Sequence, residues 1–169
     1  MACLRAVKEA WKASMDVQDQ FIGHDWRVLG NLKLTQARPG FLQAKLSVER
    51  GHVNKFMTVH GGVIMTLTDS MASLALTTSG LPPPTGVSTN IQTEFLRPAG
   101  KEGGEFVIEA EVVKLGKLLA TTRINFYDSD DVSRRKLLAF GSHTKAVNKA
   151  WENAGGVSGA RICDEADMI

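Results

Sequence analysis

The chain has 169 residues, 43% of them hydrophobic, and a formal net charge of +2 at pH 7. This length and hydrophobic content suit one domain with a buried core. The small net charge gives no reason to expect a nucleic-acid partner. No apolar run reaches the roughly 18 residues that predict a transmembrane helix, so membrane insertion is not expected.

The N-terminus and the cysteines indicate in which cellular compartment the protein is expected. Cys3 and Cys163 show neither metal-ligand spacing nor a disulfide framework, which indicates a reducing compartment. The start of the chain lacks the apolar core of a secretory signal. It is basic and amphipathic, as mitochondrial presequences are, but Glu9 and Asp16 argue against one because transit peptides are poor in acids. We therefore expect a cytoplasmic protein, with a mitochondrial location as the alternative.

The first third of the chain predicts a helix and a hairpin. Residues 3–21 carry apolar residues at helical spacing, which predicts an amphipathic helix. Two stretches in which apolar and polar residues alternate, 27–37 and 41–49, flank the turn signal Pro39-Gly40. Alternation with period two is typical of half-buried antiparallel strands, so these stretches predict a hairpin.

The central stretch turns at His60-Gly61-Gly62 and is then apolar from Val63 to Leu76, with Asp69 as its single charge. A helix that is apolar all round is a buried helix. At about 100° per residue, one face collects six apolar residues: Val63, Ile64, Leu67, Met71, Leu74 and Ala75. Asp69 falls on the opposite face, so we expect that face to meet something other than the core of its own subunit.

The second half of the chain predicts four strands. They cover residues 86–96, 105–113, 118–127 and 136–147. The connections between them are short, which suits antiparallel neighbours. The order of elements therefore predicts an α+β domain over residues 1–148, in which a six-stranded antiparallel sheet wraps around one long central helix and an N-terminal helix packs outside. Residues 149–169 are expected to form a tail that is at least partly mobile, with docking on the domain through Trp151 as the alternative.

Gly61 and Asp69 are the first candidates for chemistry. Unpaired N–H groups at a helix start attract negative charge, and a glycine lets a ligand approach the backbone. A carboxylate on an apolar flank costs free energy unless it is paired or used, so Asp69 is either functional or hydrogen-bonded for structural reasons. Eight positions separate the two residues, about 12 Å of helix. If both serve one reaction, a two-fold partner must bring its Asp69 to this Gly61.

Seven short motifs carry a family resemblance. In chain order they are His52-Val53-Asn54, Val59-His60-Gly61-Gly62, Thr68-Asp69, Gly86-Val87-Ser88, Arg97-Pro98-Ala99, Lys114-Leu115-Gly116-Lys117 and Gly141-Ser142-His143-Thr144-Lys145. In this order, over about residues 5–148, the chain resembles the hotdog-fold acyl-CoA thioesterases of the phenylacetate-pathway type. The resemblance implies hydrolysis of fatty or aromatic acyl-CoA to the free acid and coenzyme A.

The resemblance also implies roles for five residues. Gly61 would polarise the thioester carbonyl through its backbone N–H, with Asn54 assisting. Asp69 of the other subunit would be the general base or the nucleophile, and Ser88 would position the water. His60 would support the site. Each has a structural alternative: Asn54 as a turn residue, His60 as a loop hydrogen bond, and Ser88 as an ordinary strand serine. His143 lies in a matched stretch and receives no role.

Coenzyme A contacts are implied for two segments and for Ser88. The segments comprise Phe95, Leu96, Arg97, Pro98, Ala99 and Gly100, and Lys114, Leu115, Gly116, Lys117, Leu118 and Leu119. Basic residues in the later turns and strand ends would suit its phosphates, although single surface lysines are usually just solvated: Arg97, Lys101, Lys114, Lys117, Arg134, Arg135, Lys136 and Lys145.

Coenzyme A is part of substrate and product here, so no cofactor is expected, and the histidines show no spacing that predicts a metal site. The expected assembly is a homodimer with shared sites, which forms a homotetramer as relatives do. Two alternatives stay open: a non-catalytic acyl-CoA binding protein, and a hotdog dehydratase or hydratase. The latter needs a histidine paired with a carboxylate, and His60 and Asp69 are too far apart along one helix for that, although two subunits could pair them.

Overall fold

The structure, a computed structural model, describes residues 2–15, 23–153 and 155. Its elements along the chain are α1 (Ala2–Met15), α2 (His24–Leu29), β1 (Leu32–Arg38), β2 (Phe41–Ser47), the 3₁₀ turn η2 (Arg50–His52), α3 (Gly61–Thr78), β3 (Val87–Phe95), β4 (Glu105–Leu115), β5 (Leu119–Tyr127), β6 (Leu137–Ala146) and α4 (Asn148–Asn153). The six predicted strands and the central helix are all present, with ends that shift by a few residues.

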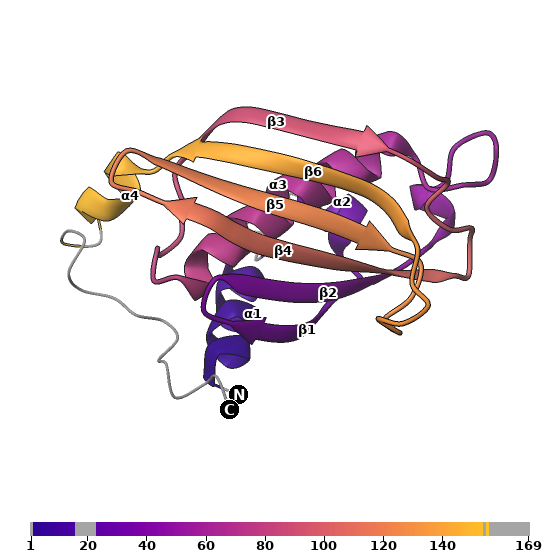
Figure 1. Cartoon of the computed structure of the whole chain (residues 1–169), viewed down its shortest axis with the longest axis horizontal. Helices are drawn as coiled ribbons and strands as arrows, with labels where there is room; N and C mark the ends of the chain where they lie inside the picture. The colour runs from indigo at the N-terminus through magenta and orange to yellow at the C-terminus, as the bar shows by residue number, and fades with distance from the viewer. Residues whose placement is uncertain (1, 16–22, 154, 156–169) are drawn as a thin grey trace.

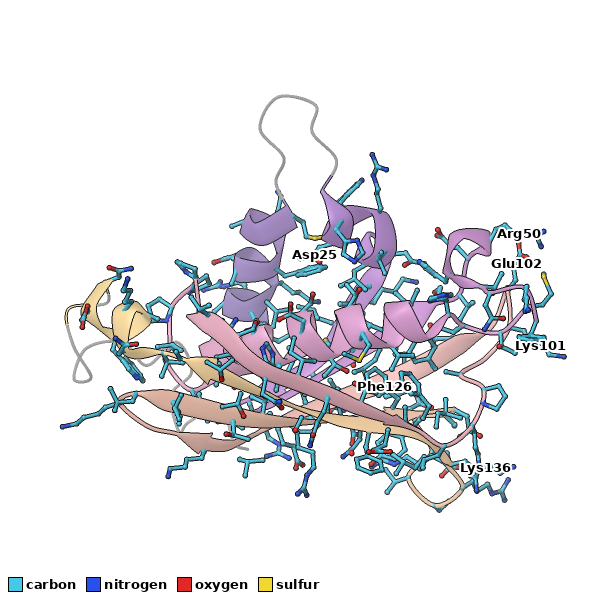
Figure 2. All side chains as sticks on the ribbon, turned by 90° about the horizontal axis from the view of Figure 1, so that it is seen from above. Asp25, Arg50, Lys101, Glu102, Phe126 and Lys136 are labelled. Atoms are coloured by element: carbon cyan, nitrogen blue, oxygen red, sulfur yellow. The ribbon has the colours of Figure 1, made fainter. Side chains whose placement is uncertain are left out.

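The strands form one antiparallel sheet in the order β1-β2-β4-β5-β6-β3. The sheet curves around α3, and the three helices α1, α2 and α3 lie on the same side of it (Figures 1 and 2). This confirms the predicted α+β architecture of a six-stranded sheet wrapped around one long helix. Because β3 pairs only with β6, it forms an open edge of the sheet.

The predicted apolar face of α3 is its buried face. All six residues of that face are buried in the main core, together with inward-facing side chains of the sheet such as Phe106, Ile108 and Phe126. The other side of α3 is only partly covered within one chain: Met65, Asp69, Ser70 and Ser73 along it are of intermediate exposure. The helix therefore packs on its own sheet with one side and leaves Asp69 on a side that is partly open.

Three local predictions need correction. The predicted N-terminal helix is confirmed as α1 only to Met15, since residues 16–22 lie outside the described part of the chain. The predicted strand over 27–37 begins only at Leu32, because the short helix α2 precedes it. The sequence showed no disulfide framework, but Cys3 is disulfide-bonded. The cysteines thus no longer support a reducing compartment.

The start of the predicted tail packs on the domain. Trp151 on α4 donates its indole N–H to the carbonyl of Gly116 at 3.1 Å, and Ala150 is buried. The alternative of docking through Trp151 therefore holds for α4, while positions 154 and 156–169, which make up most of the predicted tail, lie outside the described residues. None of the helices in the described ranges combines the length and hydropathy needed to cross a bilayer.

Candidate active site

The start of α3 presents one backbone N–H for a ligand. His60 is the N-cap, and its Nδ1 accepts a hydrogen bond from the Gly62 N–H at 2.8 Å. The Val63 N–H donates a hydrogen bond to the carbonyl of His60 at 2.9 Å. The first N–H groups of a helix have no acceptor within the helix, and that of Gly61 has no partner among the described residues. His60 thus has a clear structural role, as the cap that leaves the Gly61 N–H available.

The Gly61 N–H lies beside the first segment predicted to bind coenzyme A. A pocket of about 440 Å³ is lined by Gly61, Thr58, Val59, Ile64, Ala139 and the turn Phe95–Ala99. A Cβ atom on Gly61 would lie 3.5 Å from the Phe95 ring. Phe95 and Leu96 are more than half exposed, at 55% and 53%. The structure therefore brings together the predicted oxyanion donor and most of the 95–100 turn.

Asn54 holds the loop that leads into this pocket. Its side-chain oxygen accepts hydrogen bonds from the N–H groups of Phe56 at 2.8 Å and Thr58 at 3.3 Å, and its Nδ2 lies 3.2 Å from the Thr58 hydroxyl. These bonds are those of a turn residue, which was the structural alternative. Assistance to carbonyl polarisation stays a prediction for Asn54.

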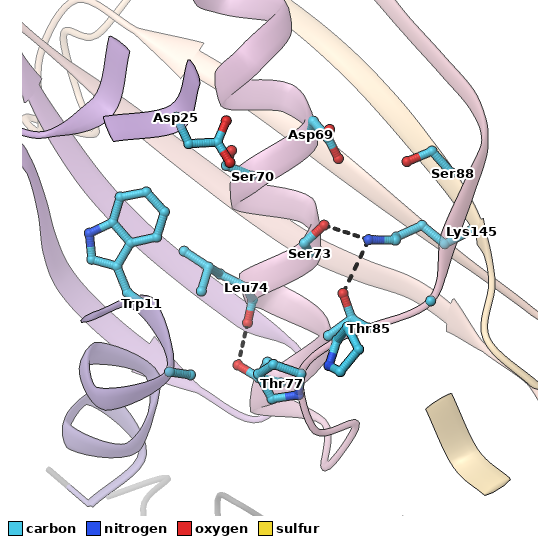
Figure 3. Close-up of a pocket in the computed structure, with 14 residues that line it drawn as sticks. Trp11, Asp25, Asp69, Ser70, Ser73, Leu74, Thr77, Thr85, Ser88 and Lys145 are labelled. Atoms are coloured by element: carbon cyan, nitrogen blue, oxygen red, sulfur yellow. Dashed lines mark hydrogen bonds between the residues drawn. The ribbon is translucent and has the colours of Figure 1, made fainter. Parts of the chain in front are cut away.

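Asp69 lines a different pocket. This cavity, of about 300 Å³, lies between the partly open side of α3, the N-terminal helices and the start of β3 (Figure 3). It is lined by Asp69 and Ser88, two of the predicted catalytic residues, and by Asp25, Trp11 and Lys145 among others. In the single chain the Asp69 side chain is 48% exposed. The structure thus brings Asp69 and Ser88 together and keeps both away from the Gly61 pocket.

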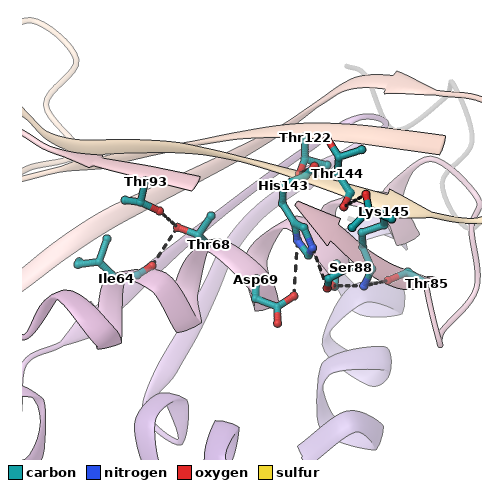
Figure 4. A network of polar contacts seen from close by, with 12 residues as sticks. Ile64, Thr68, Asp69, Thr85, Ser88, Thr93, Thr122, His143, Thr144 and Lys145 are labelled. Atoms are coloured by element: carbon teal, nitrogen blue, oxygen red, sulfur yellow. Dashed lines mark hydrogen bonds and ion pairs between the residues drawn. The ribbon is translucent and has the colours of Figure 1, made fainter. Parts of the chain in front are cut away.

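His143, which received no role from the sequence, joins Asp69 to Ser88 (Figure 4). Its Nε2 lies 2.9 Å from the Ser88 hydroxyl, and its Nδ1 lies 3.5 Å from a carboxylate oxygen of Asp69. The ring is fully buried. The matched stretch Gly141–Lys145 was the only signal for it in the sequence. Residue spacing does not show that β6 lies beside β3 and packs on α3.

The surroundings of His143 indicate its charge and which ring nitrogen carries the proton. Burial lowers the pKa of His143, although the charge of Asp69 opposes this effect, so the ring is neutral near pH 7. A carboxylate can only accept hydrogen bonds, whereas a serine hydroxyl can donate. The favoured tautomer therefore carries its proton on Nδ1, toward Asp69, and accepts the Ser88 hydroxyl proton at Nε2. His143 is hydrogen-bonded to Ser88 and lies close to Asp69, but it is not among the residues that line the cavity.

This lowered pKa makes stability depend on pH. Below the ordinary value of 6.5 the unfolded chain binds a proton at His143 more readily than the folded chain does, so stability decreases as the pH falls from 6.5 toward the folded-state pKa, by at most about 1.4 kcal/mol per pH unit. We expect the loss of unfolding free energy between pH 7.5 and 5.5, measured by urea denaturation, to be smaller in His143→Gln. An equal loss in both proteins would contradict this assignment.

Two of the basic residues that were expected to suit phosphates, Lys145 and Arg135, instead contact other side chains of the same chain. Lys145 is 6% exposed and donates to the hydroxyls of Ser73 at 2.7 Å and Thr85 at 3.2 Å. Burial lowers the pKa of Lys145, and the Asp69 charge counteracts that effect. Arg135 stacks on the Tyr127 ring, 3.8 Å from its centroid, and pairs with a carboxylate of the sheet. Lys145 thus belongs to the Asp69 pocket, and neither cation is a free phosphate ligand.

The predicted site residues fall into two groups at opposite ends of the subunit. Ser88 pairs with Lys145 near the start of β3, whereas Phe95 at its end pairs with Ala139. Seven residues of strand span about 23 Å. The second predicted segment, 114–119, lies at the Ser88 end, because Leu119 pairs with Ala146 beside the start of β3. Within one chain the predicted site residues therefore lie in two separate places.

No set of three or more metal-binding side chains occurs in the part of the chain that the structure describes. The groups described above that could take part in chemistry are a helix N-terminus with one available N–H and the carboxylate of Asp69, which lies beside a buried histidine. The long helix inside a curved antiparallel sheet, with these groups along it, is the arrangement of the hotdog-fold thioesterases.

Comparison with known proteins agrees. The family model described as the thioesterase superfamily matches residues 56–134. Human acyl-coenzyme A thioesterase 13 is 40% identical over 121 residues, which are 70% of this chain and 81% of that protein. The crystal structure of zebra fish thioesterase superfamily member 2 has a TM-score of 0.73 at 32% identity, covering 85% of this chain and 97% of the other. The mouse protein of that name has a TM-score of 0.70 at 34% identity, covering 85% and 96%. The chain belongs to the thioesterase superfamily.

Proposed function

We propose that this protein is an acyl-CoA thioesterase with two equivalent active sites, each shared between two subunits. The reaction is hydrolysis: water adds to the thioester carbonyl, the carbon–sulfur bond breaks, and the free acid and coenzyme A leave. The observation that carries the proposal is that the predicted site residues line two separate pockets of one chain, one with Gly61 and one with Asp69. A second copy related by a two-fold axis supplies the missing half to each site.

The Gly61 half binds the thioester. The Gly61 N–H and the positive end of the α3 dipole face the carbonyl oxygen, which gains negative charge as the carbon is attacked. The adjacent turn Phe95–Gly100 and the partner's 114–119 hairpin hold the coenzyme A part. Phe95 and Leu96 supply exposed apolar surface there, while Arg97, Lys114 and Lys117 are exposed cations of the same segments that suit phosphates.

The Asp69 half supplies the water. The carboxylate of Asp69 takes a proton from a water molecule as that water attacks the carbonyl carbon, and Ser88 fixes the position of the water. His143 is a positioning residue. Its contacts with the Asp69 carboxylate at 3.5 Å and with the Ser88 hydroxyl at 2.9 Å keep these two groups next to one water molecule. Because its ring is neutral, it holds Asp69 in place without neutralising its charge.

Several features support a partner on this side of the molecule. The edge strand β3 leaves Val87 70% exposed and Phe95 55% exposed, and its outer backbone groups lack a neighbouring strand. The partly open side of α3 contains Asp69 and adjoins that edge. A second copy that pairs along β3 and packs on α3 covers both surfaces. Assembly of two such dimers into a tetramer, and a cytoplasmic location, stay predictions.

The alternatives fit the site less well. A dehydratase needs a histidine that reaches the substrate, but the histidine that contacts Asp69 is fully buried and is already bonded to Ser88. A non-catalytic binding protein has no use for a carboxylate whose orientation is fixed by a buried histidine.

Release of free coenzyme A thiol from a panel of acyl-CoAs tests the proposal. We expect the wild-type protein to release thiol from at least one class among short, medium, long and aromatic acyl-CoAs, at rates well above those of the buffer. Size measurement by light scattering on the same sample verifies that it is at least a dimer. Tight binding of acyl-CoA by an intact dimer, with no thiol released from any substrate, would contradict the proposal and favour the binding protein.

A further inference from the structure

Lys145 is a buried ammonium group in the wall of the Asp69 pocket that the proposed mechanism does not use. It is 6% exposed, and its Nζ donates hydrogen bonds to the hydroxyls of Ser73 at 2.7 Å and Thr85 at 3.2 Å (Figure 3). Both partners are neutral, so these bonds hold the ammonium group in place without compensating its charge. A buried positive charge costs free energy unless a negative charge compensates it.

The compensating charge is that of Asp69, which Lys145 approaches without forming a direct ion pair within the described part of the chain. Ser73, which holds the ammonium group, lies four residues after Asp69 on α3, or about 6 Å along the helix. Burial lowers the pKa of Lys145, and the charge of Asp69 opposes that effect. Because the interaction between two charges is mutual, Lys145 also favours the charged form of Asp69.

The same ammonium group acts on His143. Lys145 lies two residues after His143 on β6 and points to the same side of the strand (Figure 4). Burial lowers the pKa of His143, the charge of Asp69 opposes this effect, and the charge of Lys145 lowers the pKa further. A protonated imidazole donates at both ring nitrogens, so it could no longer accept the Ser88 hydroxyl proton, and it would neutralise the carboxylate. Lys145 thus disfavours a proton on the histidine as well as on Asp69.

Two other titratable groups lie near this pocket, and neither replaces Lys145. Asp25 of α2 lines the wall, and its negative charge opposes the effect of Lys145 on Asp69. His24 of the same helix contacts the Thr66 hydroxyl at 3.0 Å and is not part of the wall. The wall residues from α1 and β3 carry no charge. Lys145 is therefore the one cation among the described residues that line the pocket.

We propose that Lys145 is a positioning residue for hydrolysis, whose charge keeps a proton off both Asp69 and His143. Ser73 and Thr85 hold this charge close to the carboxylate but not on it. Direct contact would instead occupy the oxygen that has to accept a proton from the attacking water. The inference rests on the proposed function, since it takes Asp69 as the general base. Its consequence is that the site stays active at mildly acidic pH.

Lys145→Gln tests this role, because it removes the charge and keeps a side-chain N–H donor for Ser73 and Thr85. We would measure kcat/KM from about pH 5 to 9, since its pH dependence reports protonation of the free enzyme. Loss of a positive charge makes proton uptake easier. The decline on the acid side should therefore begin about one pH unit higher than in the wild type, which is about a tenfold lower kcat/KM at acid pH. Lys145→Arg keeps the charge and is expected to keep the wild-type acid limb. Lys149→Met, which removes an exposed lysine from α4, should keep it as well.

NMR of ring-labelled histidine gives a readout that does not depend on activity, with the His143 signal assigned by its absence from His143→Gln. We expect His143 to bind its proton at a higher pH in Lys145→Gln than in the wild type. If Lys145→Gln does not fold, Ser73→Asp pairs the ammonium group directly with a carboxylate, and it should shift both readouts in the same direction.

A purely structural role of Lys145 would move neither readout. An acid limb or a His143 titration that stays at its wild-type pH in Lys145→Gln, or that shifts equally in Lys145→Arg, overturns the inference while the proposed function stands. Failure of the wild type to hydrolyse any acyl-CoA counts against the proposed function itself, and the histidine titration is measured independently of it.

Discussion

Asp69→Asn is expected to lower kcat by about 10³-fold while the fold and the assembly stay intact. Asparagine has the same shape but cannot take a proton from water, and general bases typically contribute about 10²–10⁴ in rate. Since the Asp69 side chain lies on the partly open side of α3 and not in the core, the substitution creates no cavity. Thiol release measured at saturating acyl-CoA gives kcat, and circular dichroism with light scattering verifies the fold and the size.

Glu152→Gln is the matched control for charge, because this exposed carboxylate on α4 lies outside both pockets. It is expected to keep wild-type kcat. If Asp69→Asn turned over substrate at a rate near that of the wild type, Asp69 would be a structural carboxylate and the mechanism would be wrong.

The role of Asp69 as base or as nucleophile has its own measurement. A single turnover in water labelled with ¹⁸O places the label in the released acid when water attacks the carbonyl directly. When Asp69 attacks first, the mixed anhydride is then hydrolysed, and attack of water on the carboxyl carbon of Asp69 leaves the label in the protein. We expect label in the acid and none in Asp69, because His143 and Ser88 are arranged around a water position beside the carboxylate.

Local sequence pattern was sufficient for the architecture. The buried face of α3 could be predicted because helical periodicity is a property of consecutive residues. The strands could be predicted for the same reason, since the alternation of apolar and polar residues is also a property of consecutive residues. Likewise, the spacing of Gly61 and Asp69 along one helix was enough to predict that, if both serve one reaction, two subunits share each site; this stays a prediction. α2 was missed, because six residues are too few to establish a helical period.

The missed site residues depend on contacts between distant parts of the chain. His143 touches Asp69 only because β6 lies beside β3 and over α3, and that order follows from the whole sheet. Lys145 is two residues further along the same strand and points to the same side, so it is buried by the same packing. Asp25 borders the pocket because α2 packs on α3. No spacing rule connects these residues: His143 received no role from the sequence, and Lys145 was indicated only as one of the basic residues that would suit phosphates.

Gly61→Pro is the second substitution with a large expected effect. It removes one hydrogen-bond donor, the backbone N–H of residue 61, and changes little else. Proline is favoured at the first position of a helix, where its missing N–H has no helical acceptor. The preceding residue, His60, has φ −66° and ψ 137°, a conformation that residues before proline readily adopt. We expect the helix to form normally and kcat to fall by about 10²–10³, the usual effect of losing one oxyanion donor.

The two inactive variants together test whether the site is shared. In a mixed dimer of Asp69→Asn and Gly61→Pro, one site combines the intact Gly61 of the first subunit with the intact Asp69 of the second, and the other site lacks both groups. If equal amounts assemble at random, half of the dimers are mixed and each has one working site, so co-expression should recover about a quarter of wild-type activity. Co-expression of Asp69→Asn with the double variant Asp69→Asn/Gly61→Pro is the control, because no dimer then contains Asp69. Activity no higher than that of the parent variants would mean that each chain holds a complete site, and the inference from the 8-residue spacing along α3 would fail.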